Sequence, residues 1–275
     1  MALKLMYITN NPDVALIAEA SGVDRIFVDM EYIGKTLRQG GMDTVQSHHT
    51  LDDINRVSKV LTKAELLVRI NPIHDASSKY ISSKEEIDKA IEYGAQILML
   101  PYFKTAREVQ QFIALVDGRA QTMPLLETPE AVNIIDDILK IDGIDEIFIG
   151  LNDLSLGYGK KFMFELLSDG TVENLIEKFK RVHLPFGFGG LASLDGGLLP
   201  GRMVLKEHYR LGSGSVILSR SFCNVNKILE LSDIRNIFET GVKAIRSYEL
   251  GITESSELER NKLEVCEIIK KIVEG

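Results

Sequence analysis

The sequence predicts a single (β/α)₈ barrel (a TIM barrel) that is followed by an extra C-terminal helix. The chain has 275 residues, 45% of them hydrophobic, which is about the length and apolar content that one barrel requires. Short apolar runs, typical of parallel strands buried on both faces, alternate with longer runs in which apolar residues recur every three or four positions. The alternative is an open doubly wound sheet, but no Gly-x-Gly-x-x-Gly follows the first strand to support it.

The apolar runs define eight strands. In chain order we expect strands at Leu3–Ile8, Arg25–Asp29, Leu66–Ile70, Gln96–Leu100, Thr122–Leu126, Glu146–Ile149, Leu184–Phe188 and Ser215–Leu218. The helical spacing predicts helices at Asn11–Ala20, Leu51–Leu61, Lys84–Tyr93, Ala106–Val116, Pro129–Leu139 and about Val225–Tyr248. Four glycines that follow helical patterns support these ends, namely Gly22, Gly94, Gly143 and Gly212.

Two helix starts carry capping signals. Thr128-Pro129-Glu130 places an N-cap threonine, a first-turn proline and a first-turn acid in succession. Thr50 and Asp53 have the spacing of a capping box, with Asp in place of the usual Glu. These signals predict helix starts just after Thr50 and Thr128.

The chain shows no linker, composition break or internal repeat, so we expect residues 1–250 to form one barrel domain. Residues 251–275 lie beyond the eighth strand and its helix, and Glu254–Glu274 carries an apolar stripe at helical spacing. A barrel needs no further helix. We therefore expect this stripe to be buried on the barrel or on a neighbouring subunit.

Composition argues against several classes of partner. The net charge of −8 repels phosphate backbones, so we expect no nucleic-acid partner. No run approaches the roughly 20 apolar residues of a membrane span, and the N-terminus lacks a signal peptide, so we expect no membrane association. Two cysteines without a paired spacing do not form a disulfide framework. The expected location is the cytoplasm.

Charged residues stand where several predicted strands end. Glu31 follows the second strand, and Arg69 is near the end of the third. Glu127 follows the fifth strand and Asp153 the sixth. Because the carboxyl ends of barrel strands converge on the catalytic face, we expect these groups to meet there. Two carboxylates suit Mg²⁺ or Mn²⁺, and an arginine suits a substrate carboxylate.

Four motifs carry a family resemblance. In order and spacing, the chain resembles the HpcH/HpaI aldolase and citrate lyase family over about residues 10–220, through Phe27–Glu31, Leu67–Pro72, Leu125–Ala131 and Ile149–Ser155. Members of that family are metal-dependent barrels that make or break carbon–carbon bonds next to pyruvate-like or acyl-CoA enolates. They commonly assemble through C-terminal helices, which implies a homo-oligomer here.

The resemblance also implies residue roles. Glu127 and Asp153 match the two positions that bind the divalent metal. Arg69 matches the arginine that binds the carboxylate and keto oxygens of the pyruvate unit. The segment of Gly150, Leu151 and Asn152 matches the place where backbone amides lie close to that carboxylate.

Glu31 has two interpretations. It orients a water molecule bound to the metal, or it forms a plain salt bridge.

Two residues depart from the family pattern. Many of these aldolases carry a histidine base directly after the Asp-x-Glu of strand two, where this chain has Tyr32. They often carry a glutamine two residues before the metal glutamate, where this chain has Leu125. The half of the site that stabilises an enolate is intact, and the half that transfers a proton is altered.

The long second loop, Tyr32–Thr50, offers replacements for the missing base. It contains Lys35, Arg38, His48 and His49. We take His49 as the candidate proton carrier, with a plain surface histidine as the alternative. Tyr32 is a second candidate, as a proton donor or as a residue that orients water.

These residues predict a metal-dependent lyase, an aldolase that acts on a 2-keto acid and an aldehyde, with a sugar-derived aldehyde as one option. The alternatives are an acyl-CoA lyase of the citrate lyase β-subunit type and a non-catalytic barrel that binds a ligand.

The glycine-rich segment 187–197 has two interpretations, a set of sharp turns or a phosphate cradle completed by Ser219-Arg220.

Overall fold

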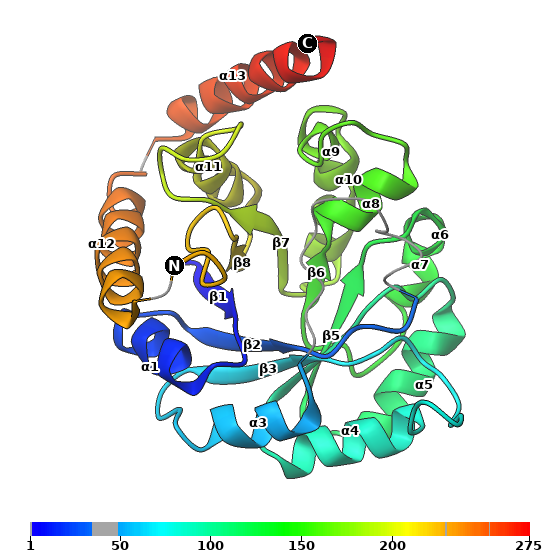
Figure 1. Cartoon of the computed structure of the whole chain (residues 1–275). Helices are drawn as coiled ribbons and strands as arrows, with labels where there is room; N and C mark the ends of the chain where they lie inside the picture. Colours follow the sequence, from blue (N-terminus) through cyan, green and yellow to red (C-terminus); the bar gives the residue numbers. More distant parts are fainter. Residues whose placement is uncertain (1, 35–48, 229, 253) are drawn as a thin grey trace.

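The structure is a computed structural model that describes residues 2–34, 49–228, 230–252 and 254–275. Its eight strands close into a barrel in sequence order, and each strand is parallel to its neighbours (Figure 1). The strands are β1 (Lys4–Ile8), β2 (Arg25–Asp29), β3 (Glu65–Arg69), β4 (Ile97–Leu100), β5 (Gln121–Leu126), β6 (Ile147–Ile149), β7 (Phe186–Leu191) and β8 (Ser215–Leu218). The predicted (β/α)₈ barrel is therefore confirmed.

Helices surround the barrel on its outer side (Figure 1). Those that precede β6 are α1 (Pro12–Ala20), α3 (Leu51–Ser58), α4 (Ser83–Glu92), α5 (Ala106–Val116), α6 (Pro129–Asn133) and α7 (Ile135–Ile138). Those that follow it are α8 (Leu151–Gly157), α9 (Glu165–Ser168), α10 (Thr171–Arg181), α11 (Gly201–Leu211), α12 (Leu231–Glu249) and α13 (Ser255–Glu274). In the described part of the chain, no helix combines the length and the apolar character that crossing a membrane requires.

The strand predictions differ most from the structure at β7, which begins at Phe186 and continues to Leu191. Its pairing with β8 shifts register between Gly187 and Gly190. A Cβ atom on Gly187 would lie 2.2 Å from the Ser215 Oγ, so only glycine lets these two strands approach so closely here. The bulge lengthens the strand beyond the apolar run that predicts it.

The helix predictions are largely confirmed, with two corrections. The predicted helix Pro129–Leu139 is interrupted at Ile134, which separates α6 from α7. The helix expected from about residue 225 begins at Leu231. Both capping signals are present, because the Thr50 and Thr128 hydroxyls accept hydrogen bonds from amides of their own first turns.

The core has two layers. Inside the barrel, eight buried side chains fill the interior: Met6, Phe27, Leu67, Ile97, Met99, Met123, Leu125 and Phe148. A larger layer lies between the outer face of the strands and the helices. The filled interior makes the barrel a packed core rather than a channel, so any site must lie at one of its two ends.

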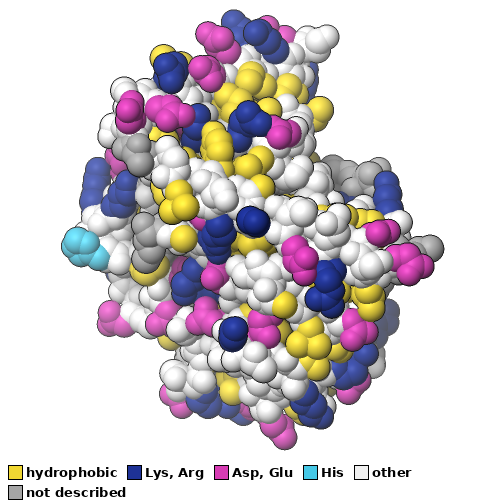
Figure 2. Space-filling view, turned by 90° about the vertical axis from the view of Figure 1, so that its left-hand side faces the viewer, with side chains coloured by type: hydrophobic (Ala, Val, Ile, Leu, Met, Phe, Trp, Pro, Cys, Tyr) yellow, Lys and Arg dark blue, Asp and Glu magenta, His cyan; other side chains and the backbone are white. Residues whose placement is uncertain are grey.

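Helix α13 lies across α11 and α9 at the outside of the barrel (Figure 1). Its Asn261 is buried and donates hydrogen bonds of 3.1 Å to the Met203 carbonyl and 2.8 Å to Glu207 Oε1. Val265 and Ile269 are buried beside it, whereas Leu263 on another side of the helix is 67% exposed. Figure 2 shows apolar side chains gathered toward the top of this side of the molecule.

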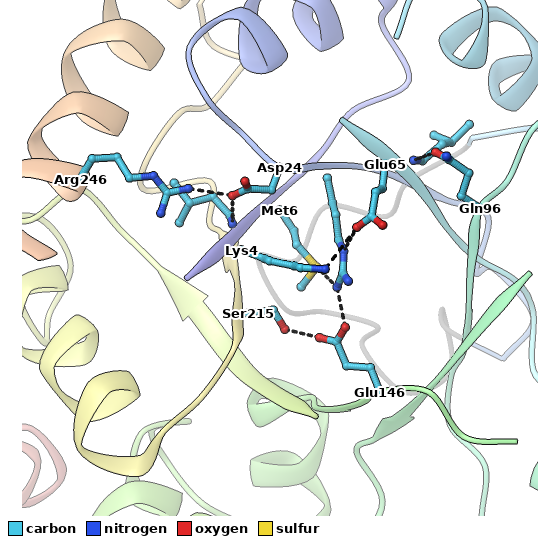
Figure 3. A network of polar contacts seen from close by, with 11 residues as sticks. Lys4, Met6, Asp24, Glu65, Gln96, Glu146, Ser215 and Arg246 are labelled. Carbon is cyan, nitrogen blue, oxygen red and sulfur yellow. Dashed lines mark hydrogen bonds and ion pairs between the residues drawn. The ribbon is translucent and has the colours of Figure 1, made fainter. Parts of the chain in front are cut away.

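A network of ion pairs closes the amino-terminal end of the barrel (Figure 3). Arg25, at the start of β2 and only 1% exposed, pairs with Glu65 at 2.9 Å and with Glu146 at 2.8 Å. Lys4 pairs with Glu65 at 3.5 Å, and Ser215 donates a hydrogen bond to Glu146. Each of these residues stands at or just before the start of a strand, so the network ties five strands together.

Candidate active site

A cavity of about 600 Å³ opens at the carboxyl end of the barrel. It is lined by residues from the ends of several strands and from the loops that follow them. Arg69, Glu127 and Asp153 lie in this lining, as do Gly150, Leu151 and Asn152. Strand-end residues that lie far apart in sequence therefore share one cavity, as the parallel barrel predicts.

Arg69 is held in place by two acidic residues. It is the last residue of β3, and its Nε and Nη2 atoms donate to the two oxygens of Asp29 at 2.8 and 2.7 Å. Its Nη1 atom lies 3.4 Å from Glu31 Oε2. Burial lowers the pKa of Arg69, but the charges of Asp29 and Glu31 outweigh this effect and raise it well above its ordinary value. The guanidinium is therefore a fixed cation.

The same geometry leaves part of Arg69 for a ligand. A guanidinium has five N–H donors, and the contacts with Asp29 and Glu31 use about three of them. The other donors belong to Nη1 and Nη2, the two nitrogens whose spacing matches the oxygens of a carboxylate. Because Asp29 holds the other edge, the guanidinium is oriented before any substrate arrives.

Glu127 is buried, with 4% of its surface exposed, and its position depends on two neighbours. The Tyr102 amide donates a 2.9 Å hydrogen bond to Glu127 Oε1, and Tyr102 adopts a left-handed φ of 49°. A Cβ atom on Gly150 would lie 2.8 Å from Glu127 Oε2, so a larger residue would displace the carboxylate. Strained backbone that aims a donor at a buried acid is typical of functional sites.

Negative charge accumulates around Glu127. Burial raises the pKa of Glu127 well above its ordinary value, and the charges of Glu31 and Asp153 raise it further. Arg69 acts in the opposite direction but does not compensate. A carboxylate that is hard to ionise beside two further acids fits a site for a divalent cation, because the cation would stabilise the ionised form.

The donor set also fits Mg²⁺ or Mn²⁺. Among the described residues, no group of three or more His, Cys, Asp or Glu side chains is arranged to hold a metal. Glu127 and Asp153 would therefore supply two oxygen ligands from the protein. Magnesium is usually bound in this way, by one or two carboxylates together with water and substrate oxygens.

Helix α8 begins at the edge of the cavity with no side chain capping its first turn. The Gly150 amide donates to the Leu126 carbonyl of β5 at 3.0 Å, so its hydrogen bond is used within the barrel and not for a ligand. Leu151 and Asn152 are the first helical residues, and their amides have no acceptor within the helix. The helix start therefore offers donors at the cavity, and Gly150 makes room for Glu127.

The two candidates for proton transfer lie in different places. His49 lines the cavity, and its Nδ1 atom accepts a 3.0 Å hydrogen bond from the Asp29 amide. A neutral His49 in this geometry carries its proton on Nε2. Tyr32 is 43% exposed, packs against Tyr80 with ring centroids 5.5 Å apart, and does not line the cavity. Lys35, Arg38 and His48 lie outside the described residues.

One supporting pair was not identified in the sequence. Asn71, just after β3, accepts hydrogen bonds from the amides of Tyr32 and Ile33 at 3.1 and 3.0 Å. Its own side chain donates to Glu86 of α4 at 2.8 Å, and burial raises the pKa of Glu86. The pair fixes the start of the second loop. An acid among the apolar positions of α4, beside Ile87 and Ala90, was the available signal.

The glycine-rich segment 187–197 runs from β7 into a set of tight turns before α11, and its Gly189 and Gly190 line the cavity. The Gly196 amide donates to the Ser193 carbonyl, and the Gly201 amide donates to that of Gly196. The Arg202 amide, in the first turn of α11, donates to the Leu194 carbonyl. Hydrogen bonds of this short range are typical of sharp turns, and they favour that interpretation for the part of the segment next to α11.

Comparison with known proteins shows similarity in sequence and in fold. The curated hydroxypyruvate/pyruvate aldolase of Roseovarius nubinhibens is 20% identical over 196 residues, which are 60% of this chain and 74% of the relative. The structure of an HpcH/HpaI aldolase from Desulfitobacterium hafniense has a TM-score of 0.59 at 18% identity, over 89% of this chain and 93% of the other. The citrate synthase SbnG has a TM-score of 0.58 at 16% identity, over 89% and 94%.

The family model matches the part of the chain that builds most of the site. The model of HpcH/HpaI aldolase/citrate lyase covers residues 4–165, which is more than half of the chain. This range contains Arg69, Glu127 and Asp153, and the structural similarities extend the shared fold over the rest of the barrel. The chain therefore belongs to the HpcH/HpaI aldolase/citrate lyase family of enzymes.

Proposed function

We propose that this enzyme is a divalent-metal-dependent carbon–carbon lyase, an aldolase that acts on a 2-keto acid through a pyruvate-type enolate. The observation that carries the proposal is the placement of one oriented arginine, Arg69, in the same cavity as the acidic pair Glu127 and Asp153. An arginine can bind the carboxylate of a keto acid, and the acidic pair can hold the cation that the charge excess favours.

Arg69 and the start of α8 would bind the keto acid together. The unused donors of Arg69 match a carboxylate or a neighbouring keto oxygen, and Asp29 keeps them pointing into the cavity. The amides of Leu151 and Asn152 would donate to the same anion from the positive end of the helix. Negative charge that develops on the keto oxygen during bond cleavage would be stabilised by Arg69.

Glu127 and Asp153 would hold the metal ion, Mg²⁺ or Mn²⁺. When bound, the ion supplies a Lewis acid that polarises the keto group. Burial of Glu127 excludes bulk water, and Gly150 leaves room for its carboxylate. The protein thereby keeps an acidic oxygen fixed beside the place where the keto acid binds.

His49 would act as a hydrogen-bond donor. Its Nδ1 atom is the acceptor of the Asp29 amide, so a neutral ring can offer only the Nε2 hydrogen to a substrate. A neutral imidazole can stabilise an oxyanion in this way. Replacement of His49 by alanine should therefore slow aldol cleavage, whereas exchange of the pyruvate methyl hydrogens should suffer less.

The decisive test of the proposed function is metal-dependent exchange of the methyl hydrogens of pyruvate in D₂O. We expect exchange in the presence of Mg²⁺ or Mn²⁺ and its loss after chelation. If no exchange occurs with either metal, the aldolase proposal is wrong and a ligand-binding barrel is favoured. Saturable binding of a CoA thioester in its place would favour the acyl-CoA lyase alternative.

We also propose a homo-oligomer that uses the α13 side of the molecule. Leu263 on α13 and Leu250 just after α12 are large apolar residues that are 67% and 83% exposed. A second copy of the chain would cover them. Sedimentation of the full-length protein should show an assembly, and deletion of the residues after Gly251 should change it. A monomer at micromolar concentration would contradict this proposal.

A further inference from the structure

A second, smaller cavity adjoins the catalytic one. It has a volume of about 210 Å³ and is formed mainly by apolar side chains that follow α8 and β7. Phe162 and Phe164 supply one side, Ala192 and Leu199 lie in the loop after β7, and Val204 on α11 completes it. A carboxylate or hydroxyl group would lose hydrogen bonds in such surroundings, whereas an apolar group would not.

The two cavities share part of their lining. Met163, Gly190 and Ser219 line both cavities. Methionine is unbranched and flexible, serine is small, and glycine has no side chain. The partition therefore consists of side chains that can open a passage from the catalytic cavity.

The backbone conformation at position 190 does not require a glycine, whereas the conformation at position 189 does. Gly189 has a φ of +58°, and a Cβ there would lie 2.8 Å from the Leu151 side chain. Gly190 lacks a positive φ, and its Cβ would have no neighbour closer than the 3.5 Å contact with Ser219. The fold would accept a side chain at position 190. The consequence of glycine there is open space at the boundary of the two cavities.

We propose that the second cavity is a subsite for an apolar substituent of the substrate, carried either by the aldehyde or by the 2-keto acid. This proposal rests on the proposed aldolase function and specifies its substrate class. An apolar cavity of about 150 Å³ can hold benzene, so 210 Å³ accommodates a phenyl ring or a short alkyl chain. Leu198, 73% exposed at the rim, would be covered by the bound group.

Two substrate series test the proposal. The first pairs pyruvate with acetaldehyde, butanal, hexanal and benzaldehyde, and the second pairs one small aldehyde with 2-keto acids of increasing chain length. In one of the two series, kcat/KM should rise about fourfold for each added methylene until the cavity is full. Ala192→Phe should abolish the rise, and Leu198→Ala should reduce it. Leu250→Ala, at a matched exposed leucine just after α12, should leave the chain-length profile as it is.

A binding measurement keeps the two proposals separable. Calorimetric titration with benzyl alcohol requires no turnover, and it should show one saturable site that Ala192→Phe removes. Loss of pyruvate exchange with retained benzyl alcohol binding would overturn the aldolase function but not the cavity. Flat profiles in both series, or benzyl alcohol binding that a folded Ala192→Phe variant retains, would overturn the subsite.

Discussion

The two ends of the barrel both bury carboxylates beside an arginine, but they differ in how the charges balance. At the amino-terminal end, the cations Arg25 and Lys4 face the carboxylates of Glu65 and Glu146 (Figure 3). At the carboxyl end, the described residues include four carboxylates, those of Asp29, Glu31, Glu127 and Asp153, and two arginines, Arg69 and Arg220.

We interpret the first network as structural and the second as the proposed functional site. Where charges are matched, the network ties strand starts together, and nothing further is needed to complete it. Among the described residues of the carboxyl end, burial and the charges of Glu31 and Asp153 raise the pKa of Glu127 well above its ordinary value, and a bound cation would stabilise its ionised form. In (β/α)₈ barrels generally, the carboxyl ends of the strands carry the active site, and the amino ends contribute to stability.

The largest expected effect on stability lies at the balanced end. Arg25→Met would leave Glu65 and Glu146 without their buried cation, and removing one partner of a buried ion pair typically costs about 3–5 kcal/mol. Because Glu65 is one-third exposed, we expect a loss near 3 kcal/mol, measured by chemical denaturation. Lys4→Met, at a half-exposed position, should cost less than about 1 kcal/mol. Equal losses in the two variants would contradict the buried network.

The next effect concerns catalysis at the unbalanced end. Arg69→Lys keeps the positive charge but loses the planar guanidinium that can bind both oxygens of a carboxylate. We therefore expect kcat/KM for a pyruvate-type substrate to fall about 100-fold, which corresponds to about 2.7 kcal/mol of transition-state stabilisation. Much of the loss should appear as a raised KM. The matched control is Arg25→Lys, which should lower stability while leaving the kinetics of the folded enzyme intact. Near-normal kinetics in Arg69→Lys would refute its role.

A smaller effect is expected from Asn71, which we regard as a positioning residue. Asn71→Ala removes the acceptor for the Tyr32 and Ile33 amides, and leaving buried partners unsatisfied costs about 1–3 kcal/mol. If the loop start orients the site, kcat should fall more than KM rises. Glu86→Gln keeps an acceptor for Asn71 and should behave like the parent enzyme. A loss of stability with unchanged kcat would show that Asn71 is merely structural.

The smallest expected effect is a pH dependence of stability. Burial raises the pKa of Glu65, but the hydrogen bond and charge of Arg25 outweigh it and hold the pKa below its ordinary 4.5. A lowered pKa contributes stability above pH 4.5 that is lost as the pH falls through the lower value. Glu65→Gln should therefore flatten the acid part of the stability curve by less than about 1 kcal/mol. An unchanged curve would contradict this.

Much of the fold and part of the site could be predicted because their signals are local. Apolar runs and caps give strands and helices, and the charges of Arg69, Glu127 and Asp153 stand at strand ends where a barrel gathers them. The bulge in β7 was not predicted because it depends on the pairing of that strand with β8. The break at Ile134 was not predicted because no glycine or proline marks it in the sequence.

The details of the site depend on orientation, which the sequence does not encode locally. His49 and Tyr32 stand in the same predicted loop, yet His49 lines the cavity and Tyr32 packs outside it against Tyr80. The role of Asn71 depends on Glu86, whose place among the apolar positions of α4 is a signal of burial but does not name its partner. Only the packed structure shows that this acid contacts Asn71.

The excess of carboxylates at the catalytic end is tested most directly by Mn²⁺ titration of four proteins under identical conditions: the parent, Glu127→Gln, Asp153→Asn and Glu146→Gln. We predict one tight site in the parent, and a loss of affinity of at least tenfold in both Glu127→Gln and Asp153→Asn. Glu146→Gln, which removes a carboxylate from the balanced end, should bind Mn²⁺ like the parent. Unchanged affinity in both Glu127→Gln and Asp153→Asn would contradict the proposed metal site.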